Sequence, residues 1–255
     1  MIINDNLRFM DDALQIENLS LSLNGNTILD DISLTLKRGA FAALCGRNGA
    51  GKSQLLRCIK GLRKPEGGRI LIDGEESDAK TRMKKIAIVF QNAEMQIVSQ
   101  SVEKDVAFGP ENMGLEKEEV ERRVEAALSA MGLKDKAKQR PQTLSGGELR
   151  KCAIAGILAM EPDVILLDEP FANLDYPSTL TVIRALITLH EKGYSLLVVS
   201  HEAEKFLAHT DTLFIMDKGR VVEAGESSVL FSKLSSYDIY IPANASFEEL
   251  SWLRR

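Results

Sequence analysis

The sequence predicts an α/β fold with a mostly parallel sheet covered by helices on both faces. Short apolar runs recur along the 255 residues, stretches with a helical period separate many of them, and 44% of the residues are hydrophobic. A chain of this size and composition can bury a substantial core, in one domain or in a domain with a lobe. Buried strands that alternate with helices are typical of a parallel sheet with helices on both sides.

The first third of the chain has the alternation of β-strands. In the runs ALQIENLSLSL and ISLTL apolar and polar residues alternate, which places Ile32, Leu34 and Leu36 on one face. The apolar run FAALC follows, then a glycine-rich turn and a helical stretch that begins near Lys52. The runs RILIDG and KIAIVF predict further strands.

Helices are predicted in the middle of the chain. From Glu118 to Met131 apolar residues recur three or four positions apart, and Gly132 follows as a cap. A second helix is expected from about Gly147 through ELRKCAIAGILAM to Pro162.

The last third returns to alternating elements. DVILL and SLLVVS predict strands, and a helix is expected from about Ser178 to Lys192, ended by Gly193. Another helix is expected after SLLVVS, followed by the hairpin TLFIMDKGRVVEAG. Near the end, Ser246 and Glu249 predict a capping box for a short helix with Trp252 as its packing anchor.

The composition of the chain excludes some classes of function. The net charge is −5 and Lys and Arg are scattered, so no nucleic-acid partner is expected. No apolar run reaches the roughly 18 to 20 residues that span a bilayer, and Met1–Leu19 lacks the layout of a signal peptide. Cys45, Cys58 and Cys152 are expected to be core thiols rather than disulfide or metal ligands. We expect a soluble cytoplasmic protein.

The segment GRNGAGKS matches the phosphate-loop pattern G-x-x-x-x-G-K-S/T between a strand and a helix. Glycines permit backbone conformations in which several N–H groups converge on phosphate oxygens at a helix N-terminus. Lys52 is expected to reach the β- and γ-phosphates, and the Ser53 hydroxyl to hold Mg²⁺. The segment predicts binding of a nucleoside triphosphate by Gly46, Arg47, Asn48, Gly49, Ala50, Gly51, Lys52 and Ser53.

The run DVILLDEP is an apolar strand that ends in two acids. Asp168 is assigned to the shell of the Mg²⁺ ion. Glu169 is assigned to orient or deprotonate water for in-line attack on the γ-phosphate. Alone, Asp-Glu-Pro is also typical of a solvated turn, but the phosphate loop favours the catalytic interpretation.

The run LSGGELR predicts a second anion-binding helix end, distinct from the phosphate loop. Ser145 can cap the helix that Gly146 and Gly147 open, which leaves N–H groups facing outward. One nucleotide site needs only one such helix end from its own phosphate loop. The second suggests that the chain presents Ser145, Gly146 and Gly147 to a nucleotide held by another chain.

Taken together, these motifs resemble the ATP-binding-cassette (ABC) ATPase family over about residues 13 to 226. The resemblance implies a P-loop NTPase core with an N-terminal antiparallel β subdomain and an inserted helical subdomain at about residues 91–161. Residues 227–255 would be a short C-terminal extension. Two identical or paralogous chains would sandwich two ATP–Mg²⁺, with Leu144–Glu148 of one chain closing over ATP held by the other.

The resemblance also assigns individual roles. It implies that Gln91 senses the metal and the attacking water, that Asn173–Asp175 crosses the dimer interface and that His201 contacts the γ-phosphate. A lone histidine after a strand is more often structural, but the place of His201 in the family pattern favours the catalytic role. His190 and His209 have no such context and are interpreted as surface or packing residues.

Two departures from the family pattern stand out. Leu23 takes the position of the aromatic residue that usually stacks on adenine. Without this stacking contact, nucleotide binding is expected to lose on the order of 0.5 to 1.5 kcal/mol of free energy. After Pro170 the chain reads FANLDY where the family often has Thr-x-Gly-Leu-Asp-Pro. The first departure predicts modest nucleotide affinity, and the second concerns the interface. Glu169 and His201 are both present, so a hydrolysing site is expected.

The stretch VFQN to ENMGL and the later run KCAIAGILAMEPDVILLDEP resemble the ATPase subunits of energy-coupling-factor (ECF) importers, including the cobalt and nickel type. The resemblance implies two ATPases on a transmembrane coupling subunit, beside a separate membrane substrate-binding subunit for a vitamin or transition metal. The chain would then lie on the cytoplasmic face of the membrane. Glu94, Glu103 and Asp105 are predicted to form an acidic lining for that coupling subunit; the alternative is that they are simply solvated.

Other functions stay open at this point. One is a soluble ABC ATPase acting on DNA or ribosomes, although no paired cassette, inserted coiled coil or basic arm is visible in the sequence. Another is the ATPase subunit of a different ABC transporter class, such as the sugar importers, which usually carry a large C-terminal regulatory domain. A small-molecule kinase would leave LSGGE and the stretch after Gln91 without a role.

Overall fold

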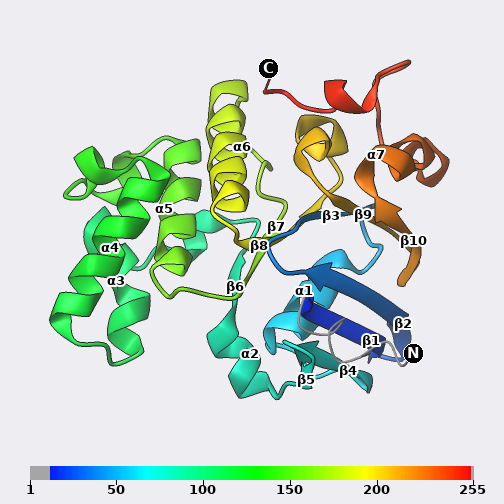
Figure 1. Ribbon diagram of the computed structural model, residues 1–255, viewed down its shortest axis with the longest axis horizontal. Helices are drawn as coiled ribbons and strands as arrows, with labels where there is room; N and C mark the ends of the chain where they lie inside the picture. The colour runs from blue at the N-terminus through cyan, green and yellow to red at the C-terminus, as the bar shows by residue number, and fades with distance from the viewer. Residues whose placement is uncertain (1–11, 254–255) are drawn as a thin grey trace, which may run out of the picture.

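A computed structural model describes residues 12–253 of the chain (Figure 1). Most of the segment Met1–Leu19, considered above as a leader, therefore lies outside the described residues, as do Arg254 and Arg255. Within residues 12–253 no helix is both long and apolar enough to cross a membrane.

The centre of the molecule is a six-stranded sheet in the order β10-β9-β3-β8-β7-β6, in which only β10 is antiparallel to its neighbour. Four of its strands, β3, β6, β7 and β8, are buried at every residue, which explains their unbroken apolar runs. The strands are β3 (Phe41–Gly46), β6 (Ile86–Val89), β7 (Val164–Asp168), β8 (Ser195–Ser200), β9 (Thr212–Asp217) and β10 (Arg220–Glu226).

A second, four-stranded sheet is antiparallel and has the order β2-β1-β4-β5. Its first hairpin turns at Asn24 and Gly25, whose φ angles of 52° and 80° suit the tight turns that join adjacent strands. The strands are β1 (Asp12–Leu23), β2 (Asn26–Lys37), β4 (Gly67–Ile72) and β5 (Glu75–Glu76). The predicted α/β class with an antiparallel N-terminal sheet is confirmed.

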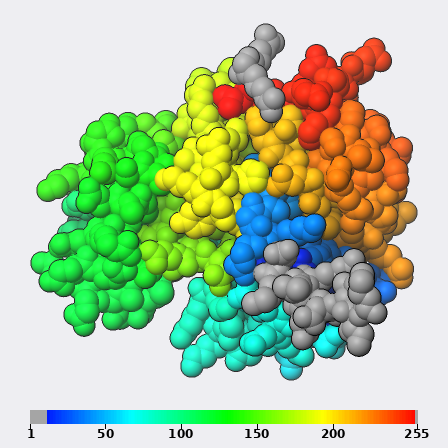
Figure 2. Space-filling model, viewed as in Figure 1, coloured from blue at the N-terminus to red at the C-terminus, as the bar shows by residue number. Residues whose placement is uncertain are grey.

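Helices form two groups. Three of them, α3 (Val102–Asn112), α4 (Lys117–Met131) and α5 (Gly146–Leu158), make a lobe beside the sheets, which Figure 2 shows in green as a separate protrusion. Gly132 ends α4 in the left-handed conformation, as predicted. The others are α1 (Lys52–Lys60), α2 (Ala79–Lys85), α6 (Tyr176–Glu191) and α7 (Ser227–Leu230), with short 3₁₀ turns η3 (Ala93–Gln96), η4 (Lys134–Lys136), η5 (Pro141–Thr143) and η8 (Phe231–Tyr237).

Two hydrophobic cores lie on the two faces of the central sheet. One joins the sheet to α1 and to the antiparallel sheet, and the other joins it to α5, α6 and the C-terminal residues. Cys45, Cys58 and Cys152 are free and buried in these cores, as expected. Burial raises the pKa of the Cys45 and Cys152 thiols to about 12.

Two sequence expectations differ from the structure. The helix expected after β8 is replaced by two 3₁₀ turns, η6 (Ala203–Lys205) and η7 (Leu207–His209). The Ser200 hydroxyl accepts the backbone N–H of Glu202 at 3.0 Å, a local bond that competes with helix formation. Near the C-terminus the predicted capping box is present, but the element it opens, η9 (Phe247–Glu249), is a single 3₁₀ turn.

Candidate functional site

The parallel register brings the carboxyl ends of β3, β7 and β8 to one edge of the central sheet. Cys45 pairs with Ser200, and Asp168 pairs with Val199. The segments that follow these strands are the phosphate loop, Glu169 and His201, so the sheet itself gathers them. Ligands of open parallel sheets bind at such carboxyl ends.

Glycines shape the loop between β3 and α1. A Cβ on Gly46 would lie 2.3 Å from the carbonyl oxygen of Met216, so no side chain fits there. Gly51 has a φ of 102°, and a Cβ on it would meet the carbonyl oxygen of Ile28 at 2.8 Å. Both positions therefore require glycine, and the loop is fixed by its contacts with β2 and β9.

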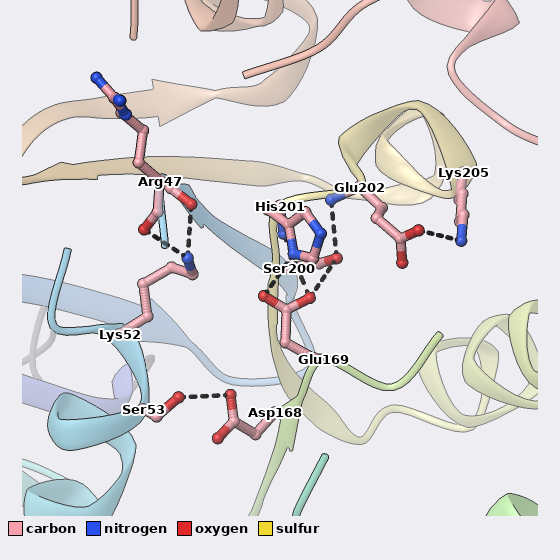
Figure 3. A network of polar contacts seen from close by, with 10 residues as sticks. Arg47, Lys52, Ser53, Asp168, Glu169, Ser200, His201, Glu202 and Lys205 are labelled. Carbon is pink, nitrogen blue, oxygen red and sulfur yellow. Dashed lines mark hydrogen bonds and ion pairs between the residues drawn. The ribbon is translucent and has the colours of Figure 1, made fainter. Parts of the chain in front are cut away.

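Lys52, the first residue of α1, is buried within the loop. Its Nζ donates to the carbonyl oxygens of Gly46 at 2.5 Å and Arg47 at 3.1 Å (Figure 3). Burial lowers the pKa of Lys52, while the carboxylate of Glu169 acts to raise it. An ammonium held by neutral carbonyls in a buried position is well placed to gain from contact with an anion.

Ser53 and Asp168 meet beside the loop. The Ser53 hydroxyl donates to Oδ1 of Asp168 at 3.1 Å (Figure 3). Burial raises the pKa of Asp168, which is 7% exposed, and the Ser53 hydrogen bond opposes that rise. A cation beside this carboxylate would relieve the cost of its burial.

The oxygen pair of Ser53 and Asp168 fits Mg²⁺. Magnesium takes oxygen ligands and is commonly bound by one or two carboxylates together with substrate phosphates and water. Residues 12–253 contain no cluster of three or more His, Cys, Asp or Glu that could hold a metal by itself. The donor set therefore fits an ion that arrives with a phosphate substrate rather than a resident protein cage.

Glu169 is held by two residues at the end of β8. Its Oε1 lies 3.0 Å from Nδ1 of His201, and its Oε2 accepts the Ser200 hydroxyl at 3.0 Å (Figure 3). Glu169 is 7% exposed and has a positive φ of 47°, a conformation that is rare for a residue with a side chain. Strained backbone of this kind clusters at functional sites, and here it accompanies a carboxylate with both oxygens engaged.

A cavity of about 400 Å³ joins these groups. It is bordered by the phosphate loop, Glu169 and His201, and also by Gln91 and the apolar Leu23 and Ile28. The structure thus brings the predicted Leu23 and Gln91 to the same cavity as the loop. Sequence reasoning missed Ile28, although its position just after the β1–β2 turn was a usable signal. The lining residues are Leu23, Ile28, Asn48, Gly49, Ala50, Gly51, Lys52, Ser53, Gln54, Gln91, Glu169 and His201.

Ser145, Gly146 and Gly147 do not line this cavity. Ser145 caps α5 by accepting the N–H of Glu148 at 3.3 Å, and the Glu148 carboxylate accepts the N–H of Ser145 at 2.9 Å. Gly146 is exposed and borders a separate cavity of about 430 Å³ with Asn173 and Gln91. Gln91 therefore lies between the phosphate-loop cavity and the open end of α5.

Arg150, on α5, is a structural residue that sequence reasoning missed. It is 4% exposed, and its guanidinium donates to the carbonyl oxygens of Phe90 at 2.8 Å and Ala172 at 3.5 Å. These carbonyls lie directly before Gln91 and Asn173. Arg150 thus ties α5 to both segments that border the second cavity.

One of the three acids predicted to line the surface for a coupling subunit is buried. Asp105 is 8% exposed, and its Oδ1 accepts the N–H groups of Val98 at 2.8 Å and Ser99 at 3.0 Å. It fixes the loop before α3 and is not available to a partner. Glu94 is exposed and borders the cavity at the start of α5, whereas Glu103 borders a different one between α3 and α4. The three acids therefore do not line a common cavity.

The other two histidines have packing roles. Nε2 of His190 lies 3.1 Å from Oδ2 of Asp211, and its ring meets Phe41 edge-on with centroids 5.8 Å apart. Nε2 of His209 lies 2.7 Å from the Ser251 hydroxyl. Both are half-buried, and neither lines the phosphate-loop cavity, in agreement with their interpretation from sequence as surface or packing residues.

Comparison with known proteins adds independent information. A family described as ABC transporter matches residues 29–172. The energy-coupling factor transporter ATP-binding protein EcfA of Methanocaldococcus jannaschii is 38% identical over 218 residues, which is 84% of this chain and 78% of that protein. EcfA2 of Clostridium tetani is 38% identical over 240 residues, 89% of this chain and 83% of that protein.

Solved structures agree with these relatives. The structure of cbiO1 from Clostridium perfringens, described as part of the ABC transporter complex cbiONQ, superposes with a TM-score of 0.82 at 34% identity. The match covers 91% of this chain and 96% of that one.

Proposed function

Because this chain belongs to the ABC transporter family and is an ATPase of that family, we propose that it is the ATP-hydrolysing subunit of an energy-coupling-factor importer. The observation that carries the proposal is the carboxylate of Glu169, held by His201 and Ser200 at the cavity of the phosphate loop. A binding module that did not hydrolyse its nucleotide would have no need of this arrangement.

In the proposed reaction the phosphate loop binds the triphosphate of ATP. Backbone N–H groups at the start of α1 and the Lys52 ammonium contact its oxygens, and the carbonyls of Gly46 and Arg47 hold that ammonium in place. Ser53 and Asp168 would hold Mg²⁺, which supplies positive charge to offset the charge that develops on the phosphate.

Glu169 orients the attacking water and accepts its proton. The bond to Nδ1 of His201 and the Ser200 hydroxyl fix the carboxylate in one orientation, as positioning of a nucleophile requires. His201 contacts the γ-phosphate, and Gln91, which borders the same cavity, senses the metal and the attacking water. Leu23 and Ile28 provide an apolar surface for the base.

The site is completed by a second ATPase subunit, identical or paralogous. The exposed start of α5 supports this, because Ser145 and Gly146 lie exposed at the N-terminus of a helix yet do not line the phosphate-loop cavity of their own chain. A transmembrane coupling subunit and a separate membrane substrate-binding subunit are the further partners, and the chain lies at the cytoplasmic face of the membrane. The solute is then selected by another polypeptide.

The test is Glu169→Gln in the full chain, with Mg-ATP as substrate. Hydrolysis is expected to fall at least about a hundredfold while ATP binding persists, with a dimer that accumulates in Mg-ATP on sedimentation. Glu125→Gln, at an exposed glutamate of α4 bonded to Lys134, is the matched control and should behave as wild type. Undiminished turnover in the first variant would refute the proposed role, and co-purification with nucleic acid in place of a membrane subunit would refute the transport role.

A further inference from the structure

Trp252 is the only tryptophan in the chain and packs against the segment that follows β8. Its backbone N–H donates to the carbonyl oxygen of Lys205 at 2.9 Å, and the Lys205 ammonium lies 4.6 Å from the centre of its ring. The Tyr176 ring is 5.3 Å from the same ring, and the Tyr176 hydroxyl donates to the Trp252 carbonyl at 3.3 Å. Two elements therefore fix the position of this side chain.

Lys205 is a buried cation beneath that ring. Its side chain is 6% exposed, and its ammonium is paired with the carboxylate of Glu202. The second oxygen of Glu202 has no hydrogen-bond partner among residues 12–253. A buried charge is costly unless it is paired, so Lys205 and Glu202 hold each other, and the tryptophan ring adds a cation–π contact.

Glu202 connects this ion pair to the catalytic carboxylate. Its backbone N–H donates to the Ser200 hydroxyl oxygen at 3.0 Å, and that hydroxyl donates to Oε2 of Glu169 at 3.0 Å (Figure 3). Since a serine hydroxyl has a single proton, accepting from Glu202 directs that proton to Glu169. The contacts run without a break from Trp252 through Lys205, Glu202 and Ser200 to Glu169.

We propose that Trp252 is a positioning residue of the ATPase site, which holds the Glu169 carboxylate in its orientation through Lys205, Glu202 and Ser200. This inference rests on the proposed role of Glu169. It gives the C-terminal residues a function that the catalytic motifs do not predict. It also links Tyr176, the residue after Asp175, to the hydrolytic centre, because Tyr176 packs on the same ring.

The test compares Trp252→Ala, Trp252→Phe and Phe247→Ala in the full chain. Phe247→Ala is the matched control, because Phe247 lies in the same C-terminal segment and its ring packs on Phe231, with centroids 5.7 Å apart. Trp252→Ala should lower kcat about tenfold with KM and the ATP dissociation constant changed less than about twofold. Trp252→Phe should restore most of the rate, since phenylalanine keeps an aromatic face over Lys205, and Phe247→Ala should match wild type. Equal rates in Trp252→Ala and wild type, or equal losses in Trp252→Ala and Phe247→Ala, would overturn the proposal.

A second pair of variants decides the question if Trp252→Ala does not fold. Lys205→Met removes the charge and keeps the length of the side chain, while Lys205→Arg keeps the ion pair. The first should lower kcat about tenfold and the second should restore it, and the fluorescence of Trp252 reports whether the ring stays packed. Equal rates in both would reject the proposal. Glu169→Gln in the same assay tests the proposed function separately, because hydrolysis that survives it refutes the role of Glu169 whatever the Trp252 and Lys205 variants do.

Discussion

Nδ1 of His201 and Oε1 of Glu169 lie 3.0 Å apart although 32 positions separate the two residues in the chain. They follow neighbouring parallel strands, and the N–H of Glu169 donates to the carbonyl of Val199 at 2.9 Å. The relative position of the two side chains is therefore set by the sheet rather than by a loop. Catalytic groups on such rigid elements keep their geometry better than groups on loops.

The Ser200 hydroxyl offers a direct test of how Glu169 is held. Ser200→Ala removes the donor to Oε2, so we expect kcat to fall about tenfold with ATP affinity unchanged in steady-state kinetics and calorimetry. The matched control is Ser195→Ala, at the other end of β8, where the buried hydroxyl accepts the Gly39 N–H at 2.9 Å. This control should cost about 1 kcal/mol of stability and no activity. A normal kcat in Ser200→Ala would contradict the role of this contact.

We expect Asp168 to lower the stability of the folded chain while supporting ATP hydrolysis. Burial raises its pKa in the folded chain above the unfolded value, so the ionised carboxylate costs stability at neutral pH and that cost is relieved as pH falls through the folded pKa. Asp168→Asn is expected to raise the unfolding temperature at pH 7 without nucleotide, and this gain should shrink in acid. Hydrolysis and the stabilisation by Mg-ATP should be lost. Thermal unfolding at several pH values, with and without Mg-ATP, measures the change in stability and the stabilisation by nucleotide. A lower unfolding temperature of Asp168→Asn than of wild type at pH 7 would contradict this account.

Leu23 borders the phosphate-loop cavity at the place proposed for the base. Leu23→Tyr should add a stacking contact of about 0.5 to 1.5 kcal/mol, which is about two- to tenfold in the ATP dissociation constant. Leu62→Tyr, at an exposed leucine outside this cavity, is the control. Calorimetric titration with ATP and GTP measures the dissociation constants. An ATP dissociation constant that is unchanged in Leu23→Tyr would show that the base does not bind beside Leu23.

Gly147 marks a close contact between α5 and α6. A Cβ at this position would lie 2.8 to 3.0 Å from three atoms of Ser178, so Gly147→Ala must push the helices apart. We expect a loss of about 1 to 3 kcal/mol in urea unfolding. Gly156→Ala in the same helix, where the nearest atom is 3.9 Å away, should instead be neutral or stabilising. Equal stability of the two variants would contradict the contact.

With Asp105 buried, Glu94 is the most exposed of the three acids predicted to contact a coupling subunit. It is exposed beside the start of α5, so Glu94→Lys should weaken co-purification with a hydrophobic membrane subunit and leave the ATPase rate of the isolated chain unchanged. Glu125→Lys, an equal charge reversal on α4, is the control. Undiminished recovery of the membrane subunit with the Glu94 variant would reject this acid as a docking residue.

The sequence alone determined the features that depend on short segments. The phosphate loop, Gly46–Ser53, and the acid pair Asp168–Glu169 are each recognised from residues that are adjacent in the sequence. The buried strand that precedes each of them appears as an apolar run. The capping box of Ser145 and Glu148 is equally local, since its two bonds join residues three apart. The fold class and the position of the phosphate loop between a strand and a helix could therefore be predicted before any coordinates.

Only the tertiary structure decided what the remaining polar side chains do. From sequence Asp105 is expected to be a surface acid, yet in α3 it is buried and accepts two backbone N–H groups of the preceding loop. The segment after β8 has apolar residues enough for a helix, but Ser200, Lys205 and the distant Trp252 hold it in another shape. The contacts of Trp252 join residues far apart in the chain, and their approach is set by tertiary packing rather than by local pattern. The burial of Asp105 likewise depends on how the loop before α3 packs. That is why the catalytic motifs could be named from sequence, whereas the residues that position them could not.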